Sequence, residues 1–246
     1  MHYRLPLLVL FLVATATGYG QDAPATLLDK AIKATGGEAK LTKLQAMTIK
    51  GKGTYFQDGQ KLPFVLSWWN VGADKYRQTI EIESMGAKSQ ETWVMNGKDG
   101  WHKLGPLVEA KVMPKEELEE TREEVYFNWI SMLAPLKGKE FKLTPLDEAK
   151  VDGKAVVGFT VARKGNRDAK LYFDKETGLL AKGERKVKDE GKELTEETLF
   201  SGYKDVDGVK MAMRVVVRRE GKPHAELDIT DAKLEEKLDP KLFTKP

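Results

Sequence analysis

Apolar and polar residues alternate along most of the chain, and a period of two is typical of β-strands with one buried face. We predict about eleven strands. Turns rich in Gly, Asp and Asn separate most of them, which favours hairpins and an antiparallel sheet. Gly51 and Gly53, inside the first strand, indicate a twist or bulge. The predicted strands are residues 47–55, 61–70, 75–83, 90–95, 101–104, 154–164, 169–173, 179–187, 192–203, 209–219 and 223–232.

Two segments have helical spacing instead. Residues 24–35 place four apolar side chains on one side and end at a Gly-Gly pair, and a short helical turn follows over 38–44. Residues 114–133 begin with proline and several glutamates, which suit a helix N-terminus, and continue into an apolar stripe. A sheet of this length must curl or close. We therefore expect a mainly β (α+β) fold, with an N-terminal helix and an inserted helix on its concave side.

The N-terminus has a different composition from the rest. Residues 1–4 are a short basic start, residues 5–16 are apolar, and small residues follow at 18 and 20. This pattern predicts a signal peptide over 1–20, cleaved after Gly20, and a single domain over 21–246. The apolar run is shorter than the ~20 residues that span a bilayer, so we expect no stable membrane anchor. The expected location is the periplasm or the exterior of the cell.

Composition narrows the class of protein. The chain has 41 Lys and Arg against 38 Asp and Glu, a formal net charge of +3, and the two signs are interspersed. A nucleic-acid footprint would gather basic residues on one face, so no nucleic-acid partner is expected. The sequence contains no cysteine, so it forms no disulfide and no thiolate metal site, and it has no residue that a lipoprotein would acylate at its cleavage site.

A search for catalytic chemistry finds little. No metalloprotease, nucleophile-elbow, Walker or dinucleotide motif occurs. His102 and His224 are far apart in sequence, which is poor evidence for a metal site, and we interpret both as hairpin residues. Glu81 and Glu83 share one strand face, which is the usual wet face of a sheet. We expect no catalytic residue, metal or cofactor, and a hydrolase using His102 or His224 with a carboxylate is the least favoured alternative.

Large apolar side chains are more informative about a possible binding site. All five tryptophans fall between Trp68 and Trp129. Aromatic and methionine residues of this kind either fill a core or line a cavity for a flexible apolar ligand. The candidates for a shared interior are Phe64, Leu66, Trp68, Trp93, Met95, Trp101, Met211 and Met213.

Four stretches resemble a known family. They are VMNGKDGW (94–101), YFDKETGLLAK (172–182), GYKDVDGVKMAMRV (202–215) and LDPKLFTKP (238–246). Their order and spacing are similar to those of the LolA-like family of periplasmic lipoprotein carriers and outer membrane lipoprotein-sorting proteins, with its LolA, LolB and LppX relatives. Residues 72–75 (GADK) depart from the carriers, which have a basic residue and a proline before the third strand.

The resemblance implies a half-open β-barrel whose helices lid an apolar cavity, and a cavity that holds acyl chains. The expected protein is non-enzymatic and binds a lipophilic ligand, an acyl chain or a lipoprotein, under a lid formed by residues 114–133. The expected ligand-binding residues are Phe64, Leu66, Trp68, Trp93, Met95, Trp101, Tyr126, Trp129, Leu133, Phe173, Met211 and Met213.

An alternative stays open from the sequence. The barrel could be filled by its own side chains, and an outer face or an edge strand would then bind an envelope protein partner. A cavity inside the curled sheet would favour the ligand-binding hypothesis over the self-filled barrel.

Overall fold

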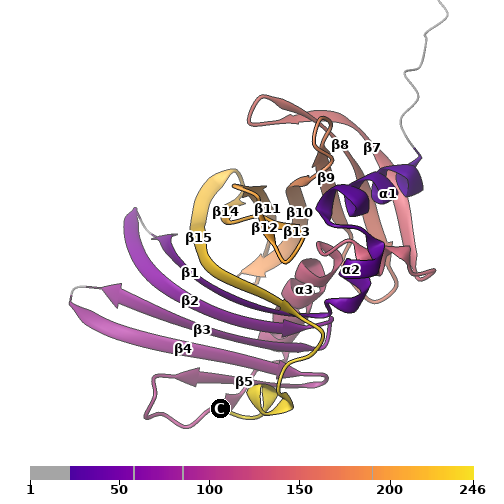
Figure 1. Ribbon diagram of the computed structural model, residues 1–246. Coiled ribbons are helices and arrows are strands. Elements are labelled where there is room, and N and C mark those ends of the chain that lie inside the picture. Colours follow the sequence, from indigo (N-terminus) through magenta and orange to yellow (C-terminus); the bar gives the residue numbers. More distant parts are fainter. Residues whose placement is uncertain (1–22, 58, 85, 190) are drawn as a thin grey trace, which may run out of the picture.

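The computed structural model describes residues 23–57, 59–84, 86–189 and 191–246. Within them, a sheet of 13 antiparallel strands follows the order β6-β5-β4-β3-β2-β1-β15-β14-β11-β10-β9-β8-β7, and β12 and β13 form a separate ribbon. The sheet curls strongly without closing, so β1–β5 and β7–β9 face each other obliquely across the interior (Figure 1). The prediction of a curled, half-open and mainly β fold is confirmed.

The element bounds are as follows. The strands are β1 Ala46–Gln57, β2 Gln60–Val71, β3 Lys75–Ser84, β4 Ala87–Asn96, β5 Asp99–Leu104, β6 Lys111–Val112, β7 Phe141–Val151, β8 Lys154–Arg163, β9 Ala169–Asp174, β10 Leu180–Asp189, β11 Lys192–Ser201, β12 Lys204–Val206, β13 Val209–Met211, β14 Arg214–Arg219 and β15 Lys222–Glu235. The helices are α1 Pro24–Thr35, α2 Glu38–Lys43, α3 Lys115–Ile130, and the 3-10 turns η1 Ala134–Lys137 and η2 Pro240–Phe243.

The predicted strand count was too low. β6, β7 and β12 were not predicted, and the single strand expected over 209–219 is divided into β13 and β14. β7 is an edge strand that contains Pro145, which a strand tolerates at an edge because no neighbour needs its missing N–H. The division after Met211 lets the β12–β13 ribbon leave the main sheet.

Hairpin chemistry explains the long meander. Asp152 and Gly153 both have positive φ, as do the residues of the Asp207–Gly208 and Glu220–Gly221 pairs. Two successive positive φ angles give turns whose twist matches that of the flanking strands. The pairing between β1 and β15 shifts register between Lys50 and Gly51, so the bulge predicted around Gly51 is confirmed.

The three α-helices lie on the concave side of the sheet (Figure 1). η2 lies on the opposite face, where Arg77 of β3 donates a hydrogen bond to its Leu242 carbonyl at 3.2 Å. α1 and the C-terminal half of α3 pack on β8, β9 and β10, where Phe159, Leu171 and Phe173 are fully buried. α3 also reaches the other arm of the sheet, where its Val125 packs against Tyr76 and Met95 with Leu118 beside them. η2 contacts β3 and β4 and buries Phe243. α3 therefore bridges the two arms of the curled sheet.

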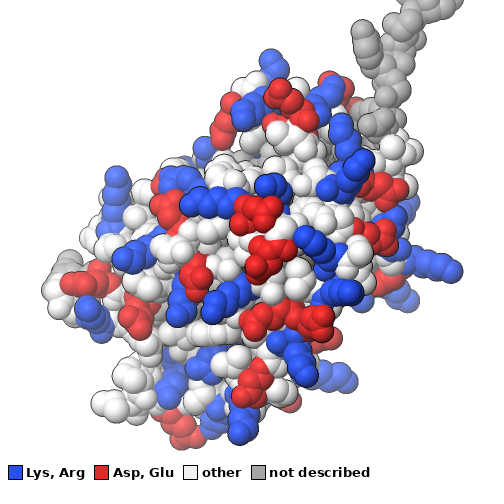
Figure 2. Space-filling model, in the orientation of Figure 1, with Lys and Arg blue, Asp and Glu red and all other residues white. Residues whose placement is uncertain are grey.

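The outer surface carries mixed charge. Figure 2 shows Lys and Arg interspersed with Asp and Glu over the face in view. Cross-strand pairs account for part of this pattern, such as Lys170 with Glu184 at 2.7 Å and Lys182 with Glu197 at 2.8 Å. The predicted signal peptide, residues 1–20, lies outside the described residues. No helix in the described part of the chain has both the length and the apolar character needed to cross a membrane.

Candidate ligand cavity

A cavity of about 370 Å³ lies on the concave side, beneath the five central strands β2, β1, β15, β14 and β11. Its walls also include α2, the C-terminal half of α3, β10 and the β12–β13 ribbon. α1 and α3 cover the neighbouring part of the sheet, β8 and β9, which we call the sealed arm. They leave the central strands less covered. Its volume falls within the range of small-molecule sites, roughly 300–1,000 Å³.

Strand alternation produces the apolar walls. Met47 and Ile49 of β1 share one face, as do Phe64, Leu66 and Trp68 of β2, because every second side chain points the same way. Glycines allow close packing beside them. A Cβ on Gly53 would lie 2.3 Å from the Phe64 ring, so the aromatic ring lies directly on the backbone of the neighbouring strand. Further apolar lining comes from Leu41, Leu44, Phe127, Leu133, Leu180, Phe200, Val209, Met211, Val215, Val217, Leu227, Ile229 and Leu234.

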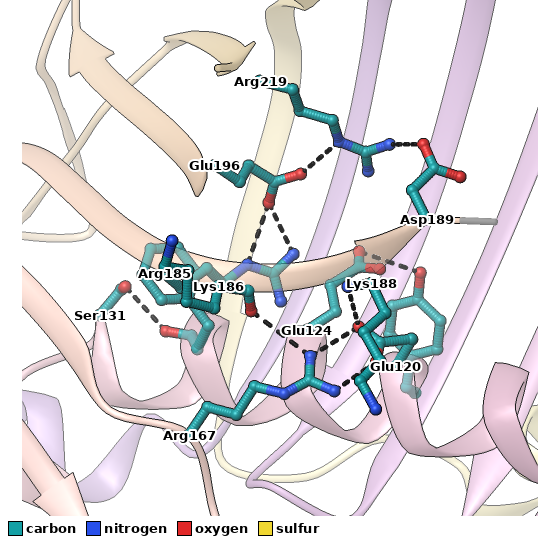
Figure 3. Close-up of polar contacts among 12 residues, drawn as sticks. Glu120, Glu124, Ser131, Arg167, Arg185, Lys186, Lys188, Asp189, Glu196 and Arg219 are labelled. Atoms are coloured by element: carbon teal, nitrogen blue, oxygen red, sulfur yellow. Dashed lines mark hydrogen bonds and ion pairs between the residues drawn. The ribbon is translucent and has the colours of Figure 1, made fainter. Parts of the chain in front are cut away.

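One part of the cavity wall is polar. Arg185, Glu196 and Arg219 lie directly opposite one another on β10, β11 and β14. Glu196 accepts hydrogen bonds from Nη2 of Arg185 at 2.7 Å and from Nε of Arg219 at 2.9 Å, and Figure 3 shows its carboxylate between the two guanidiniums. Burial acts to raise the pKa of Glu196, but the two arginines outweigh it and hold that pKa below its ordinary value. Arg219 also donates to the half-exposed Asp189 at 2.9 Å.

Glu124 of α3 faces the same part of the cavity (Figure 3). The Tyr76 hydroxyl donates to its Oε1 over a long 3.5 Å, and no ion pair to Glu124 occurs among the described residues. Burial raises the pKa of Glu124, and Glu196 adds to the rise, whereas Arg185 and Arg219 oppose it. A carboxyl group in this setting favours its neutral form.

Other polar groups line this region. The Trp68 indole Nε1 is buried and has no hydrogen-bond partner in the described structure, and its ring lies 6.4 Å from that of Tyr76. Tyr55 and His224 also line the cavity. Burial raises the pKa of the Tyr55 hydroxyl, and burial together with Arg219 lowers the pKa of His224, so both side chains favour their neutral forms.

Polar tethers hold α3 over the sheet. Glu120 accepts a hydrogen bond from Arg167 Nη1 at 2.7 Å and another from the Lys188 backbone at 2.9 Å (Figure 3). Arg122 donates to the carbonyl of Lys98 at 3.0 Å, in the turn between β4 and β5. A Cβ on Gly183 would lie 2.3 Å from the Phe127 ring, so glycine lets α3 approach β10 closely.

The structure places five of the twelve expected ligand-binding residues on the cavity wall, and these are Phe64, Leu66, Trp68, Leu133 and Met211. That they bind a ligand stays a prediction. Met213 packs beside this group, against Met47, Ile49 and Ile229.

The other expected residues lie elsewhere. Met95 packs under Val125 of α3, and Phe173 lies in the sealed arm. Trp93 donates to Glu117 of α3 at 3.0 Å. Trp101 pairs with Val94, so strand alternation places it on the face opposite Trp93. Their contact with a ligand also stays a prediction.

Tyr126 and Trp129 of the predicted lid face β7 and β8. Both rings lie within 6.0 Å of the Arg163 guanidinium, and Trp129 lies 5.8 Å from Phe141. α3 instead presents Glu124 and Phe127 to the cavity. Thr121, Val125, Tyr126, Phe127 and Ile130 are all buried, because the helix has sheet on two sides.

The two histidines have different settings. His102 stacks on Trp93 at 4.7 Å and lies 3.0 Å from Glu91 and 3.2 Å from Glu117, so it links β4, β5 and the start of α3. His224 lines the cavity beside the arginines. The described residues contain no group of three or more side chains that could hold a metal ion.

The polar residues of the cavity were not predicted. Arg219 continues the alternation of Val215 and Val217, and Glu196 that of Thr198 and Phe200, so parity within each strand could have placed both on the inner face. The assembled site offers an apolar interior for a chain and a charged, hydrogen-bonding region for a polar group. It is suited to binding an amphiphilic molecule.

Comparison with solved structures identifies the fold. A LolA superfamily protein from Nitrosomonas europaea matches with a TM-score of 0.58 and 14% identity, over 90% of this chain and 97% of its own. A domain described as an outer membrane lipoprotein-sorting protein, from Vibrio parahaemolyticus, matches with a TM-score of 0.56 and 14% identity, over 89% and 96%. A DUF1329 family protein from Desulfovibrio piger matches with a TM-score of 0.57 and 13% identity, over 91% and 98%.

The chain therefore has the LolA-like fold, and the resemblance seen in the sequence is confirmed at the level of fold. No family model matches the sequence. No curated protein matches it either.

Proposed function

We propose that this chain is a secreted or periplasmic, non-enzymatic protein that binds a hydrophobic ligand in the concave cavity and serves lipid or lipoprotein transport. The observation that carries the proposal is the cavity of about 370 Å³ with mostly apolar walls, in a protein with the LolA-like fold. The lipoprotein-sorting description of one structural match supports an acylated ligand.

The cavity volume limits the size of the ligand. An engineered cavity of about 150 Å³ holds one benzene molecule, so about 370 Å³ accommodates roughly fifteen heavy atoms. That is one alkyl chain with a small headgroup. Each buried methylene contributes about 0.8 kcal/mol, and the cost of association offsets part of the total. A single medium-length chain would therefore bind with useful affinity.

A titration with an alkyl ligand tests the proposal. We expect decanol to change the intrinsic tryptophan fluorescence, because Trp68 lines the cavity, and to bind saturably by calorimetry. Native mass spectrometry of protein purified from its own host should show a co-purified lipid. No binding of any alkyl ligand in either experiment would overturn the proposal.

Two neighbouring substitutions provide a matched control. Val217 lines the cavity, opposite Ala225 and Thr198, whereas Val216 points to the other face of β14. We expect Val217→Phe to fill the cavity and weaken decanol binding at least about tenfold, a loss of about 1.4 kcal/mol. Val216→Phe should leave binding unchanged. Equal loss in both variants would show that the ligand binds outside the cavity.

The proposed location rests on residues 1–20. N-terminal sequencing of the protein from its host should give a mature chain beginning at residue 21. A chain that still begins at Met1 in the cytoplasm would contradict this part of the proposal.

A protein-binding role is the second candidate. Leu104, Leu107, Val108 and Val112, around the β5–β6 connection, are large apolar residues exposed to solvent, which favours a partner surface. Leu107→Ser combined with Val112→Ser should abolish capture of an envelope partner without changing decanol binding. The self-filled barrel of this alternative has no internal space, whereas the structure contains a cavity.

A further inference from the structure

The polar wall of the cavity is an unusual place for charge. Glu196 has only 5% of its surface exposed, and Arg185 and Arg219 both bond to it. Moving these charges out of water costs free energy that their pairing offsets only in part. A purely apolar ligand would gain nothing from this cluster, so its presence inside a lipid-sized cavity needs an explanation.

Hydrogen-bond donors outnumber acceptors in this region. The carboxylate of Glu196 is shared by two guanidiniums, and Arg185 also lies 5.2 Å over the Phe127 ring. Each guanidinium carries five N–H donors, more than these contacts use.

Positive charge also exceeds negative charge on this part of the wall. Arg185 and Arg219 bring two positive charges to the wall, and Glu196 brings one negative charge. Asp189 contacts Arg219 from the half-exposed hairpin beyond the cavity. When Glu124 is neutral, the inner wall keeps an excess of positive charge.

The charged row and the apolar residues around α2 lie toward opposite ends of the central strands, because Val217, two residues before Arg219, is in register with Tyr55 through Ala225 of β15. Met47 begins β1, near Leu41 and Leu44 around α2, whereas Tyr55 lies toward its far end. Roughly 26 Å of extended strand separates the two. A molecule with one polar end and one chain therefore fits in a single orientation.

We propose that the Arg185–Glu196–Arg219 row, with Glu124, receives the anionic headgroup of a single-chain amphiphile whose alkyl chain extends toward α2. This inference rests on the proposed function and specifies the ligand class. The shared chemistry is a compact anion, a carboxylate or a phosphate-like group, which matches the geometry of arginine. An alkylammonium headgroup would meet two guanidiniums and is disfavoured.

Glu124 makes the site sensitive to pH. The titratable and charged groups around it are Tyr76 of β3, Tyr55 of β1, Arg185 of β10, Glu196 of β11 and Arg219 of β14. A neutral Glu124 donates a hydrogen bond to an anionic headgroup, whereas an ionised Glu124 repels it. Anion binding should therefore weaken as rising pH ionises Glu124.

Calorimetric titration of the wild-type protein with decanoate, decyl sulfate, decanol and decylammonium tests the ligand class without any substitution. We expect the two anions to bind at least about tenfold tighter than decanol, because hydrogen bonds to charged groups contribute about 1.5–3 kcal/mol. Decylammonium should bind weakest. Acetate and sulfate alone should bind far more weakly than either anionic amphiphile, because they lack the chain.

The outcomes separate the two proposals. Decanol binding as tightly as decanoate, or decylammonium binding tighter, would overturn the anionic-headgroup inference and leave the hydrophobic cavity standing. If none of the four alkyl ligands binds, the proposed function fails, and this inference fails with it. If acetate or sulfate binds as tightly as the amphiphiles, the site is a plain anion site, and the single-chain inference is wrong.

Glu124→Gln tests the role of that carboxyl group. Decyl sulfate keeps its charge over the pH range in which carboxyl groups ionise, so any loss of wild-type affinity with rising pH reports on the protein. We expect that loss in the wild type and a flat profile in Glu124→Gln, with affinity at neutral pH equal to or above the wild-type value. Identical pH profiles for the wild type and Glu124→Gln would remove Glu124 from the site.

Discussion

The sealed arm and the central strands share the same alternating sequence pattern, but their concave-facing side chains are buried to different extents. On β8 and β9, Phe159, Leu171 and Phe173 are fully buried beneath α1 and α3. On β14 and β15, Val215 and Leu227 face the same concave side and remain partly exposed. Helix placement over the concave face, rather than strand composition, decides which arm becomes core and which becomes cavity.

This difference assigns separate tasks to one sheet. The sealed arm supplies the packed core on which α1 and α3 rest, and a domain without disulfides depends on such a core. The central strands are free to carry space and charge because stability comes from elsewhere. Substitutions in the two regions should therefore differ in magnitude.

The largest expected effect comes from truncating leucine in each region. Leu171→Ala should lower the free energy of unfolding by about 3–5 kcal/mol, because it leaves a cavity in a fully buried site. Leu227→Ala, at the wall of an existing cavity, should cost about 1–2 kcal/mol. Urea unfolding of both variants measures the difference. Equal costs would show that the central strands are packed as tightly as the sealed arm.

The two buried glutamates should respond to pH with opposite signs. The folded pKa of Glu196 is lowered, so its stabilisation is present above the ordinary glutamate pKa and is lost as pH falls through the folded value. Glu196→Gln should lower stability at neutral pH by about 2–4 kcal/mol, and the difference should shrink in acid.

Glu124 provides the matched contrast within this prediction. Its folded pKa is raised, so its stabilisation is present at low pH and is lost as pH rises through the folded value. Glu124→Gln should equal the wild type in acid and exceed it at neutral pH. Thermal unfolding across this pH range measures both variants. A destabilised Glu124→Gln at neutral pH would show that the ionised carboxylate is paired.

A smaller effect is expected where α3 meets the sheet. Gly183→Ala places a Cβ against the Phe127 ring and should cost about 1–3 kcal/mol through overpacking. Phe127→Ala in the same chain should relieve that clash, so the double mutant should be more stable than the sum of the single changes predicts. If the losses in free energy of unfolding measured in urea are additive, the cost of Gly183→Ala does not come from contact with Phe127.

Most of the fold could be predicted from alternation and turn chemistry. α1 begins and ends at the predicted residues, and positive-φ turns such as Asp152–Gly153 and Asp207–Gly208 fall in the Gly- and Asp-rich segments next to the predicted strands. β7 could not be predicted in the same way, because Pro145 and the charged pair Asp147 and Glu148 interrupt its pattern. An edge strand tolerates these residues, but its edge position is a property of the assembled sheet.

The cavity was only partly visible in the sequence. Parity along β2 correctly grouped Phe64, Leu66 and Trp68. The role of α3 could not be read from one apolar stripe, because Tyr126 and Phe127 face different walls. The charged row was hidden among many surface charges, since only cross-strand register brings Arg185, Glu196 and Arg219 together.

The two edges of the open sheet have a consequence for association between molecules. An unclosed sheet presents unpaired backbone groups that can recruit further strands and lead to aggregation. Here one edge, β6, is only 2 residues long, and the other, β7, carries Pro145, exposed charges and a register shift after Leu146. Such features disfavour edge-to-edge pairing, so the sheet can stay open around its cavity with little tendency to recruit strands from other molecules.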